Sequence, residues 1–370
     1  MISCGARQPQ PKQTFVPRDS AEVVKSPVTP EEEQRIAEIS QNFYNTLLRT
    51  GFNGAFLVAK DDSICYEQYH GYENLRRRTP INEHSAFHLA SVSKTFTAML
   101  VLKLREQGKI NLDSTVRYYL PTFPYPGVTI KMLLDHRSGL PNYLYFMNSI
   151  PWDKKQFLTN EALLGILVKY RPRPMAPPGT RFHYCNTNYA MLALVIEAVT
   201  HVPFPEYLKE QIFDPLGMKD TYVFQPDDRE TAMPSYLRNG RLEQWTDLDG
   251  TYGDKNVYST ARDLLKWDAA LRGSFLTQSS LEMAYTPYSF EKPGIKNYGL
   301  GWHMYLYPSE KVIFHNGYWH GNNAVFFRLL NEGYTIIVLG NKYDRFIYHV
   351  QPLAEALTGR KFATDTTAVE

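Results

Sequence analysis

The residues best suited to chemistry are a serine and a lysine three positions apart. Ser91 and Lys94 form an S-x-x-K tetrad ahead of an apolar run, residues 96–102, which ends near Gly108, a residue typical of helix C-termini. Positions i and i+3 share one face of a helix, so we expect Ser91 Oγ to meet Lys94 Nζ. In the first helical turn, free N–H groups favour negative charge developing at Ser91. A buried lysine with a lowered pKa can accept the serine proton, so the tetrad predicts a serine nucleophile with a lysine base.

A Y-x-N motif, Tyr184-Cys185-Asn186, supplies a second set of groups. A tyrosine held near two cations could act as a phenolate base, and an asparagine can bridge to Lys94 and to a substrate amide. We interpret Cys185, between them, as a packed small residue and not as a nucleophile.

A third motif, His315-Asn316-Gly317, follows the apolar residues 312–314 and therefore lies on a predicted late strand. Glycine at position 317 would let a substrate backbone approach the strand edge. The backbone N–H of Tyr318 could form an oxyanion hole together with that of Ser91. The motif therefore predicts substrate-positioning residues at 315–317.

Two of the three motifs also occur where they lack a catalytic context. A second S-x-x-K, Ser289 to Lys292, runs into Pro293-Gly294, which cannot continue a helix. A second Y-x-N, Tyr72 to Asn74, lies in the first hairpin, where we interpret it as a solvated turn. The order of the three selected motifs along the chain, more than any one of them, favours an active site.

Composition excludes several other classes of function. The chain has 370 residues, 43% hydrophobic and 21% charged, with a formal net charge of +2 and no basic run, so we expect no nucleic-acid partner. Its apolar stretches are shorter than the roughly 18 residues that a membrane span needs, so we expect a soluble domain. An odd and scattered set of cysteines, and histidines without H-E-x-x-H spacing, indicate no disulfide framework, no metal site and no cofactor.

The N-terminal 30 residues are rich in proline, glutamine and lysine and predict a flexible linker. Met1 to Gly5 is similar to the end of a bacterial lipoprotein signal, in which Cys4 would carry a lipid and tether the protein to a membrane. The alternative interpretation is that Cys4 is an exposed, unmodified cysteine in a flexible N-terminus. We expect a single domain over residues 31–362 and a disordered tail at 363–370.

The pattern of elements predicts an α+β fold. A helix is expected from Pro30 to about Leu48, and strands at 54–60 and 64–72 form a hairpin. Residues 91–285 are mainly helical. Strands return after residue 298, at 313–314, 324–330 and 334–339, and a final helix follows at 346–357. Strands from both ends can complete one antiparallel sheet, flanked by helices, with the helical lobe inserted in the middle.

In these motifs the chain resembles the serine β-lactamase and penicillin-binding-protein superfamily. The resembled branch contains class C β-lactamases, D-alanyl-D-alanine carboxypeptidases, esterases and D-aminopeptidases. The likeness covers about residues 35–358. Besides the three motifs it rests on segments 133–141 (LLDHRSGLP), 178–189, 215–221 (PLGMKDT), 259–264 (STARDL) and 298–302 (YGLGW).

The resemblance implies a β-lactamase/transpeptidase-like fold and an acyl-enzyme mechanism. Ser91 would attack a carbonyl, and Lys94 with Tyr184 would handle the proton in acylation and deacylation. Asn186 would hold the lysine and the substrate. We expect His136, in the L-L-D-H-R segment, to be structural. The resemblance also implies a bacterial periplasm or cell envelope location, with the cytoplasm left open.

One position departs from the pattern of the resembled family. His315 stands where β-lactamases and carboxypeptidases usually place a lysine, and a histidine is mostly neutral at pH 7. This favours an ester or a D-amino-acid-containing peptide or amide as the substrate. A true β-lactamase or D-Ala-D-Ala carboxypeptidase is the alternative, and a non-catalytic penicillin-binding sensor is the alternative of another class. The substrate itself depends on aromatic-rich loops near 143–157 and 225–256, and the sequence does not name it.

Overall fold

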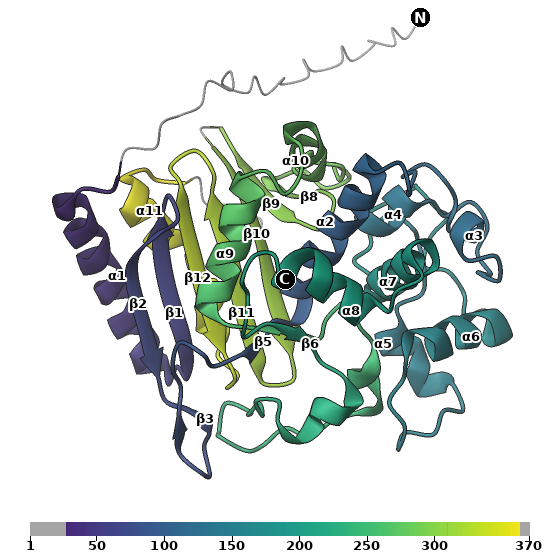
Figure 1. Ribbon diagram of the computed structural model, residues 1–370, viewed down its shortest axis with the longest axis horizontal. Coiled ribbons are helices and arrows are strands. Elements are labelled where there is room, and N and C mark those ends of the chain that lie inside the picture. Colours follow the sequence, from purple (N-terminus) through teal and green to yellow (C-terminus); the bar gives the residue numbers. More distant parts are fainter. Residues whose placement is uncertain (1–26, 309, 363–370) are drawn as a thin grey trace, which may run out of the picture.

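The computed structural model describes residues 27–308 and 310–362 (Figure 1). Residues 1–26 of the predicted linker, the Cys4 lipid anchor and the tail lie outside these residues, and they stay predictions; residues 27–29 have no regular structure, and the first helix begins at Pro30. Within the described ranges, no helix is both long enough and apolar enough to cross a bilayer.

A seven-stranded antiparallel sheet joins the two ends of the described chain, as predicted. Its order is β2-β1-β12-β11-β10-β9-β8, and the N-terminal hairpin meets the C-terminal strands where β1 pairs with β12. Both pairs β10–β11 and β11–β12 are also antiparallel. The strands are β1 (Gly54–Lys60), β2 (Ser63–His70), β8 (Lys296–Tyr298), β9 (His303–Tyr307), β10 (Glu310–Trp319), β11 (Asn322–Leu329) and β12 (Tyr334–Gly340).

The sheet is buried on both faces because its strands alternate between two apolar cores. Phe56, Val312 and Val338 face α1 (Pro30–Thr50) and α11 (Gln351–Thr358). Leu57, Ile313 and Ile337 belong to the core shared with α9 (Ala261–Arg272) and the helical lobe. This period of two is what a sheet covered on each side requires. Figure 1 shows α9 crossing the face of the sheet opposite to α1.

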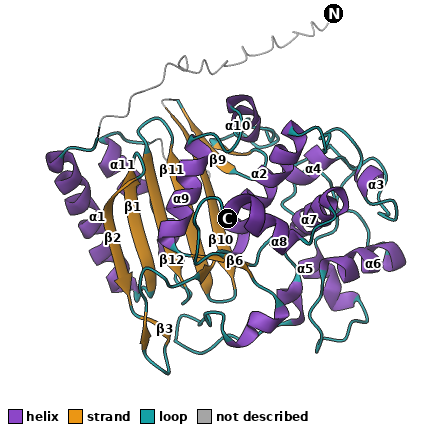
Figure 2. Cartoon of the chain, viewed as in Figure 1, coloured by secondary structure: helices purple, strands orange, loops and turns teal. Residues whose placement is uncertain are grey.

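The predicted helical lobe is confirmed, and Figure 2 shows helices gathered beside the sheet. Its centre is α2 (Ser93–Glu106) and α7 (Asn186–Thr200), both almost fully buried along their lengths. The remaining helices are α3 (Val116–Tyr119), α4 (Ile130–Leu134), α5 (Tyr143–Phe146), α6 (Asn160–Tyr170), α8 (Phe204–Leu208) and α10 (Gln278–Ala284).

Three local predictions need correction. The lobe also contains a small sheet, β5 (Phe87–His88), β7 (Val257–Ser259) and β6 (Tyr222–Val223), whose strands are too short to show a period. The solvated turn at 72–74 is instead β3 (Tyr72–Asn74), paired with β4 (Thr79–Pro80). The final helix is divided into a 3-10 turn at 345–348 and α11. The proline at position 352 starts α11 because its ring would clash with a preceding helical turn.

A buried ion pair joins the sheet to α9. Arg328 on β11 and Asp268 on α9 are both fully buried, and Arg328 Nε donates to Asp268. Arg272 Nε donates to the same carboxylate at 2.8 Å, and Thr335 Oγ1 at 2.5 Å. Burial alone would raise the pKa of Asp268, but Arg328 and Arg272 hold that pKa below its ordinary value.

We expect Asp268→Asn to lower the free energy of unfolding by about 3–5 kcal/mol, because it leaves the Arg328 guanidinium buried without its counter-charge. Denaturant unfolding at pH 7 measures the loss. The control is Asp214→Asn, which breaks the exposed Lys209–Asp214 pair and should cost less than about 1 kcal/mol. Equal losses in the two variants would contradict a structural role for the buried pair.

Candidate active site

Ser91 lies in a tight turn immediately before α2. The turn is a 3-10 helix over Ala90–Val92, so Ser91 precedes the α-helix in which the sequence predicted it. Ala90 has a φ of +48°, a strained value for a residue with a side chain. The neighbouring residues hold this conformation: Ala90 N donates to His88 Nδ1 at 3.0 Å, and Leu89 N donates to Val257 O at 2.8 Å.

Lys94 meets Ser91 as predicted and has two further acceptors. Its Nζ donates to Ser91 Oγ at 3.0 Å, to Asn186 Oδ1 at 2.7 Å and to the backbone carbonyl of Asp254 at 2.7 Å. The side chain is fully buried. Burial, with a smaller contribution from the nearby Lys255 cation, lowers the pKa of Lys94 to about 7, against the opposing effect of Asp254. A substantial fraction of Lys94 is therefore neutral near pH 7 and able to accept a proton.

Tyr184 and Asn186 are placed by the start of α7 and by His136. Asn186 is the first residue of α7, which directs its amide toward Lys94. His136 holds the chain on either side of Tyr184, because its carbonyl accepts from His183 N at 2.8 Å and its Nδ1 accepts from Cys185 N at 3.1 Å. The imidazole lies 4.2 Å from the Tyr184 ring, centroid to centroid. His136 is thus a buried structural residue that positions Tyr184, as expected.

Cys185 is buried beneath the site and does not face it. Its Sγ contacts the carbonyl oxygens of Leu140 and Pro141 at 3.5 and 3.6 Å. Burial raises the pKa of the thiol to about 11, so a thiolate is disfavoured and the packing interpretation agrees with the structure.

The protonation state of Tyr184 differs from one prediction. Burial raises the pKa of its hydroxyl, and a hydrogen bond with Ser91 only partly offsets this effect. The sequence suggested a phenolate stabilised by two cations. Lys94 Nζ is 5.0 Å from the ring centroid, but the neighbouring His315 is neutral because burial holds its pKa well below the ordinary value. Tyr184 is therefore a phenol at neutral pH, suited to donate a proton, and Lys94 is the better base.

The third motif lies on β10, where strand alternation separates its members. His315 and Gly317 face the lobe and the Ser91 turn, whereas Asn316 lies on the opposite face with Val312 and Phe314. Gly317 is needed because an added Cβ would lie 2.1 Å from the carbonyl oxygen of Leu89. The close approach is therefore made by the chain itself and not by a substrate backbone, which is a correction to the predicted reason for this glycine.

His315 is fully buried and uncharged. Its Nδ1 is 2.8 Å from the Asn316 carbonyl oxygen, and its Nε2 is 3.3 Å from the Tyr298 hydroxyl. The carbonyl can only accept, so Nδ1 carries the proton and Nε2 accepts from the tyrosine. Burial, followed by His303 and Lys94, holds the pKa of His315 well below its ordinary value.

The predicted oxyanion hole has a favourable backbone arrangement. Pairing between β9 and β10 ends at Phe314, so the following residues of β10 form an open edge. A two-residue turn joins Trp319 to its partner Asn322, and in an antiparallel ladder hydrogen-bonded pairs alternate with non-bonded ones. The N–H of Tyr318 therefore points away from β11, toward the edge. Its side chain is 59% exposed, so only the backbone fits the predicted role.

Two contributors escaped the sequence interpretation. The Asp254 carbonyl holds Lys94, and Lys255 adds a buried cation close by. Both belong to the segment Gly253-Asp254-Lys255-Asn256, where charged residues beside a glycine resemble an ordinary exposed loop. Their contacts with Lys94 and Tyr143 span more than a hundred residues, so only their proximity to the S-T-A-R-D segment could have drawn attention to them.

A cavity of about 230 Å³ lies beside the end of β10. Trp319, His320, Trp245 and Tyr258 contribute to its walls, together with Arg77 and Arg229. Trp245 thus lines a hollow, as one of the predicted loop aromatics, whereas Tyr252 packs on Phe204. No group of three or more His, Cys, Asp or Glu side chains in residues 27–308 and 310–362 is arranged to hold a metal ion.

Comparison with known proteins identifies the family of this chain. A family model described as Beta-lactamase matches residues 39–359. Penicillin-binding protein 4* of Bacillus subtilis is 32% identical over 315 residues, covering 79% of this chain and 69% of that protein. A D-aminopeptidase of Cereibacter sphaeroides is 25% identical over 296 residues, covering 79% of this chain and 57% of that enzyme.

Among solved structures, a penicillin binding protein from Bacillus halodurans superposes with a TM-score of 0.76 at 27% identity, covering 85% of this chain and 98% of that chain. The fold predicted from the strand and helix pattern is thereby confirmed. The chain belongs to the beta-lactamase family and is a serine hydrolase.

Proposed function

We propose that this hydrolase forms an acyl-enzyme on Ser91 and acts on an ester, or on a peptide or amide that contains a D-amino acid. The observation that carries the proposal is the contact between Ser91 Oγ and the buried Lys94 Nζ at 3.0 Å. Because the pKa of Lys94 is lowered to about 7, the amine can take the serine proton without a further base.

In acylation, Ser91 Oγ attacks the substrate carbonyl carbon and its proton passes to Lys94 Nζ. The backbone N–H groups of Ser91 and Tyr318 stabilise the oxyanion. The Tyr184 hydroxyl donates a proton to the leaving oxygen or nitrogen as the bond to carbon breaks, and Lys94 returns its proton to Tyr184. Water then attacks the acyl-enzyme, a proton passes back along the same groups, and Ser91 is released.

The proposed substrate preference rests on His315. A neutral, fully buried imidazole offers no positive charge to a substrate carboxylate, which β-lactams and D-Ala-D-Ala peptides carry. Neutral esters and amides need no such partner. The likeness to a D-aminopeptidase supports the amide branch of the proposal. Turnover of nitrocefin would instead support the β-lactamase alternative, and a long-lived penicillin adduct would support the sensor.

We expect Ser91→Ala to reduce p-nitrophenyl ester hydrolysis by at least about 10³-fold, because the nucleophile is removed. Intact mass after fluorophosphonate treatment should show one adduct on the wild-type chain and none on this variant. The matched control is Ser289→Ala in the second S-x-x-K, which should keep full activity. An adduct on the Ser91→Ala chain would show that another residue is the nucleophile.

The pH profile tests the base. A group with a lowered pKa loses its proton at lower pH, so neutral Lys94 becomes dominant as the pH rises through about 7. We expect kcat/KM for a neutral ester to increase over this range and then level. An increase that begins only above about pH 9 would show a lysine with an ordinary pKa, and Lys94 would not be the base in the resting enzyme.

His315→Lys tests the substrate preference. A lysine is longer than histidine and charged, so it could place an ammonium near a carboxylate of a substrate bound at Ser91. A hydrogen bond to a charged group contributes about 1.5–3 kcal/mol. We expect the ratio of kcat/KM for a carboxylate-bearing substrate, nitrocefin or a D-Ala-D-Ala peptide, to that for a neutral ester to rise by about tenfold or more. The neutral ester controls for general damage to the site. An unchanged ratio would mean that position 315 does not set the preference.

A further inference from the structure

The loop from Thr251 to Asn256 wraps around the start of α2. Gly253 O accepts from Thr97 Oγ1 at 2.8 Å, Asp254 O accepts from Lys94 Nζ at 2.7 Å, and Val257 N, just after the loop, donates to Ser93 Oγ at 3.1 Å. Three successive contacts therefore tie this loop to the helix that carries Lys94. The position of the Asp254 carbonyl depends on how firmly the loop is held.

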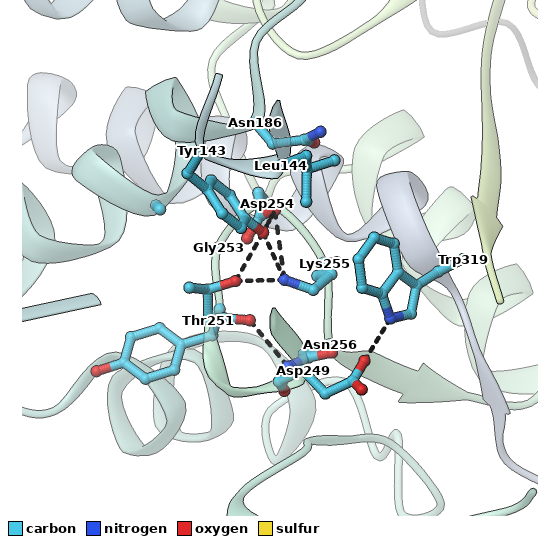
Figure 3. A network of polar contacts seen from close by, with 12 residues as sticks. Tyr143, Leu144, Asn186, Asp249, Thr251, Gly253, Asp254, Lys255, Asn256 and Trp319 are labelled. Atoms are coloured by element: carbon cyan, nitrogen blue, oxygen red, sulfur yellow. Dashed lines mark hydrogen bonds and ion pairs between the residues drawn. The ribbon is translucent and has the colours of Figure 1, made fainter. Parts of the chain in front are cut away.

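Lys255 holds the loop from inside. Its side chain is only 3% exposed, and its Nζ donates to the Tyr143 hydroxyl at 2.6 Å and to the Thr251 hydroxyl. The Asp254 carboxylate lies 3.7 Å from the ammonium, and the Tyr143 hydroxyl donates to that carboxylate at 2.7 Å. Figure 3 shows Lys255 at the centre of these contacts, between Thr251, Tyr143 and Asp254.

Asn256 and Trp319 close the network on its other side. Asn256 has a φ of +76°, and its Nδ2 donates to the carbonyl oxygens of Asp249 and Thr251 at 2.6 and 2.8 Å. The Trp319 indole donates to Asp249 at 2.5 Å, and the Lys255 ammonium lies 5.0 Å from the Trp319 ring centroid. These contacts fix the loop at both ends (Figure 3).

The two buried lysines, Lys94 and Lys255, both contact Asp254. Lys94 binds the backbone carbonyl of Asp254, and Lys255 pairs with its side chain. Two cations in a region of low dielectric repel each other strongly, so each makes a positive charge on the other more costly. Burial lowers the pKa of Lys255 as well, but Asp254 and Asp249 oppose that effect, and the acceptors of Lys255 include a carboxylate whereas those of Lys94 are neutral oxygens. Lys94 is therefore the lysine that gives up its proton.

We propose that Lys255 is a positioning residue for the acylation step: its buried ammonium fixes the loop that offers the Asp254 carbonyl to Lys94 and keeps Lys94 in its neutral, proton-accepting form. The inference rests on the proposed function of Ser91 and Lys94. Lys255 does not touch the substrate, since its side chain is buried. Its removal should affect the chemical step and leave substrate binding nearly unchanged.

Lys255→Met tests the inference, because methionine keeps the length and apolar stem of lysine but has no charge. Without the second cation, Lys94 holds its proton to a higher pH. We expect the acid limb of the kcat/KM profile for a p-nitrophenyl ester to move upward by about one pH unit, which lowers kcat/KM about fivefold at pH 7, with KM changed less than twofold. Lys255→Arg should keep the limb near its wild-type position.

Other titratable groups face the two lysines and must be considered in the profile. Those around Lys255 are Asp249, Asp254, Tyr143 and His88; those around Lys94 are Tyr184, Cys185, His136, His303 and His315. The histidines around Lys94 have pKa values below their ordinary range, so they do not ionise between pH 6 and 9 and do not produce the limb.

The matched control is Lys103→Met. Lys103 lies on α2 like Lys94, and its Nζ donates to the Phe275 carbonyl at 2.6 Å, away from the site. It should leave the limb in place. A Lys255→Met enzyme whose limb stays at the wild-type pH overturns the inference, whether or not activity falls, because a purely structural lysine would lower activity equally at every pH.

Tyr143→Phe covers the case in which Lys255→Met does not fold, because it removes only the hydroxyl that Lys255 contacts. We expect a several-fold lower kcat with an unchanged KM, and a wild-type kcat would overturn the inference. Failure of the proposed function gives a different result. A wild-type chain that neither hydrolyses the ester nor reacts with fluorophosphonate refutes the role of Ser91, whereas an active wild type matched by its Lys255 variants refutes only the inference.

Discussion

The site depends on the cost of burying one amine. Lys94 is removed from water completely, and a protonated ammonium in that place must find enough acceptors to replace its hydration. It has three, and each comes from a different part of the chain: Ser91 from the turn before α2, Asn186 from the start of α7, and the Asp254 carbonyl from a distant loop. The balance between these acceptors and the loss of water brings its pKa close to neutrality.

The site also requires the helical lobe and the sheet to meet closely at the Ser91 turn. The Ser91 turn leans on β10 so closely that only glycine fits at position 317, opposite the Leu89 carbonyl. The strained φ of Ala90 is maintained by contacts with β7 and with His88. Residues distant in the chain thus hold the nucleophile at the open edge of a strand, where backbone N–H groups are free. A rigid sheet covered on both faces provides the support that such a strained turn needs.

The features that the sequence predicted well are local or repeat along the chain. Ser91 and Lys94 are three residues apart and meet as expected, and the β-rich segments 313–314, 324–330 and 334–339 predict strands of the terminal sheet. The uncharged state of His315 followed from the residue type and was reinforced by burial. The features it missed depend on register and on distant partners. The side chain of Asn316, predicted to position the substrate, faces away from Ser91 because of strand alternation.

The role of Lys255 was also missed because it depends on a partner distant in the sequence. A lysine next to an aspartate predicts a solvated loop, since lysine is among the residues least often buried. Only the three-dimensional arrangement brings Tyr143, from a helix over a hundred residues earlier, into contact with its ammonium. The protonation state of Tyr184 was missed for a related reason. It depends on the complete burial of the hydroxyl, which raises its pKa and which the Y-x-N motif alone does not reveal.

The two departures, a neutral residue at position 315 and a buried cation at position 255, are best understood together. A lysine at 315 would place a positive charge on the β10 side of the site, where it would bind a substrate carboxylate and also disfavour protonation of Lys94. With histidine there, the first effect is lost. We infer that the second is supplied by Lys255, which is buried behind the Asp254 carbonyl and out of reach of the substrate. In the proposed function, activation of the serine and recognition of a substrate charge are thereby separated, and such a site can form an acyl-enzyme while it favours substrates that carry no carboxylate.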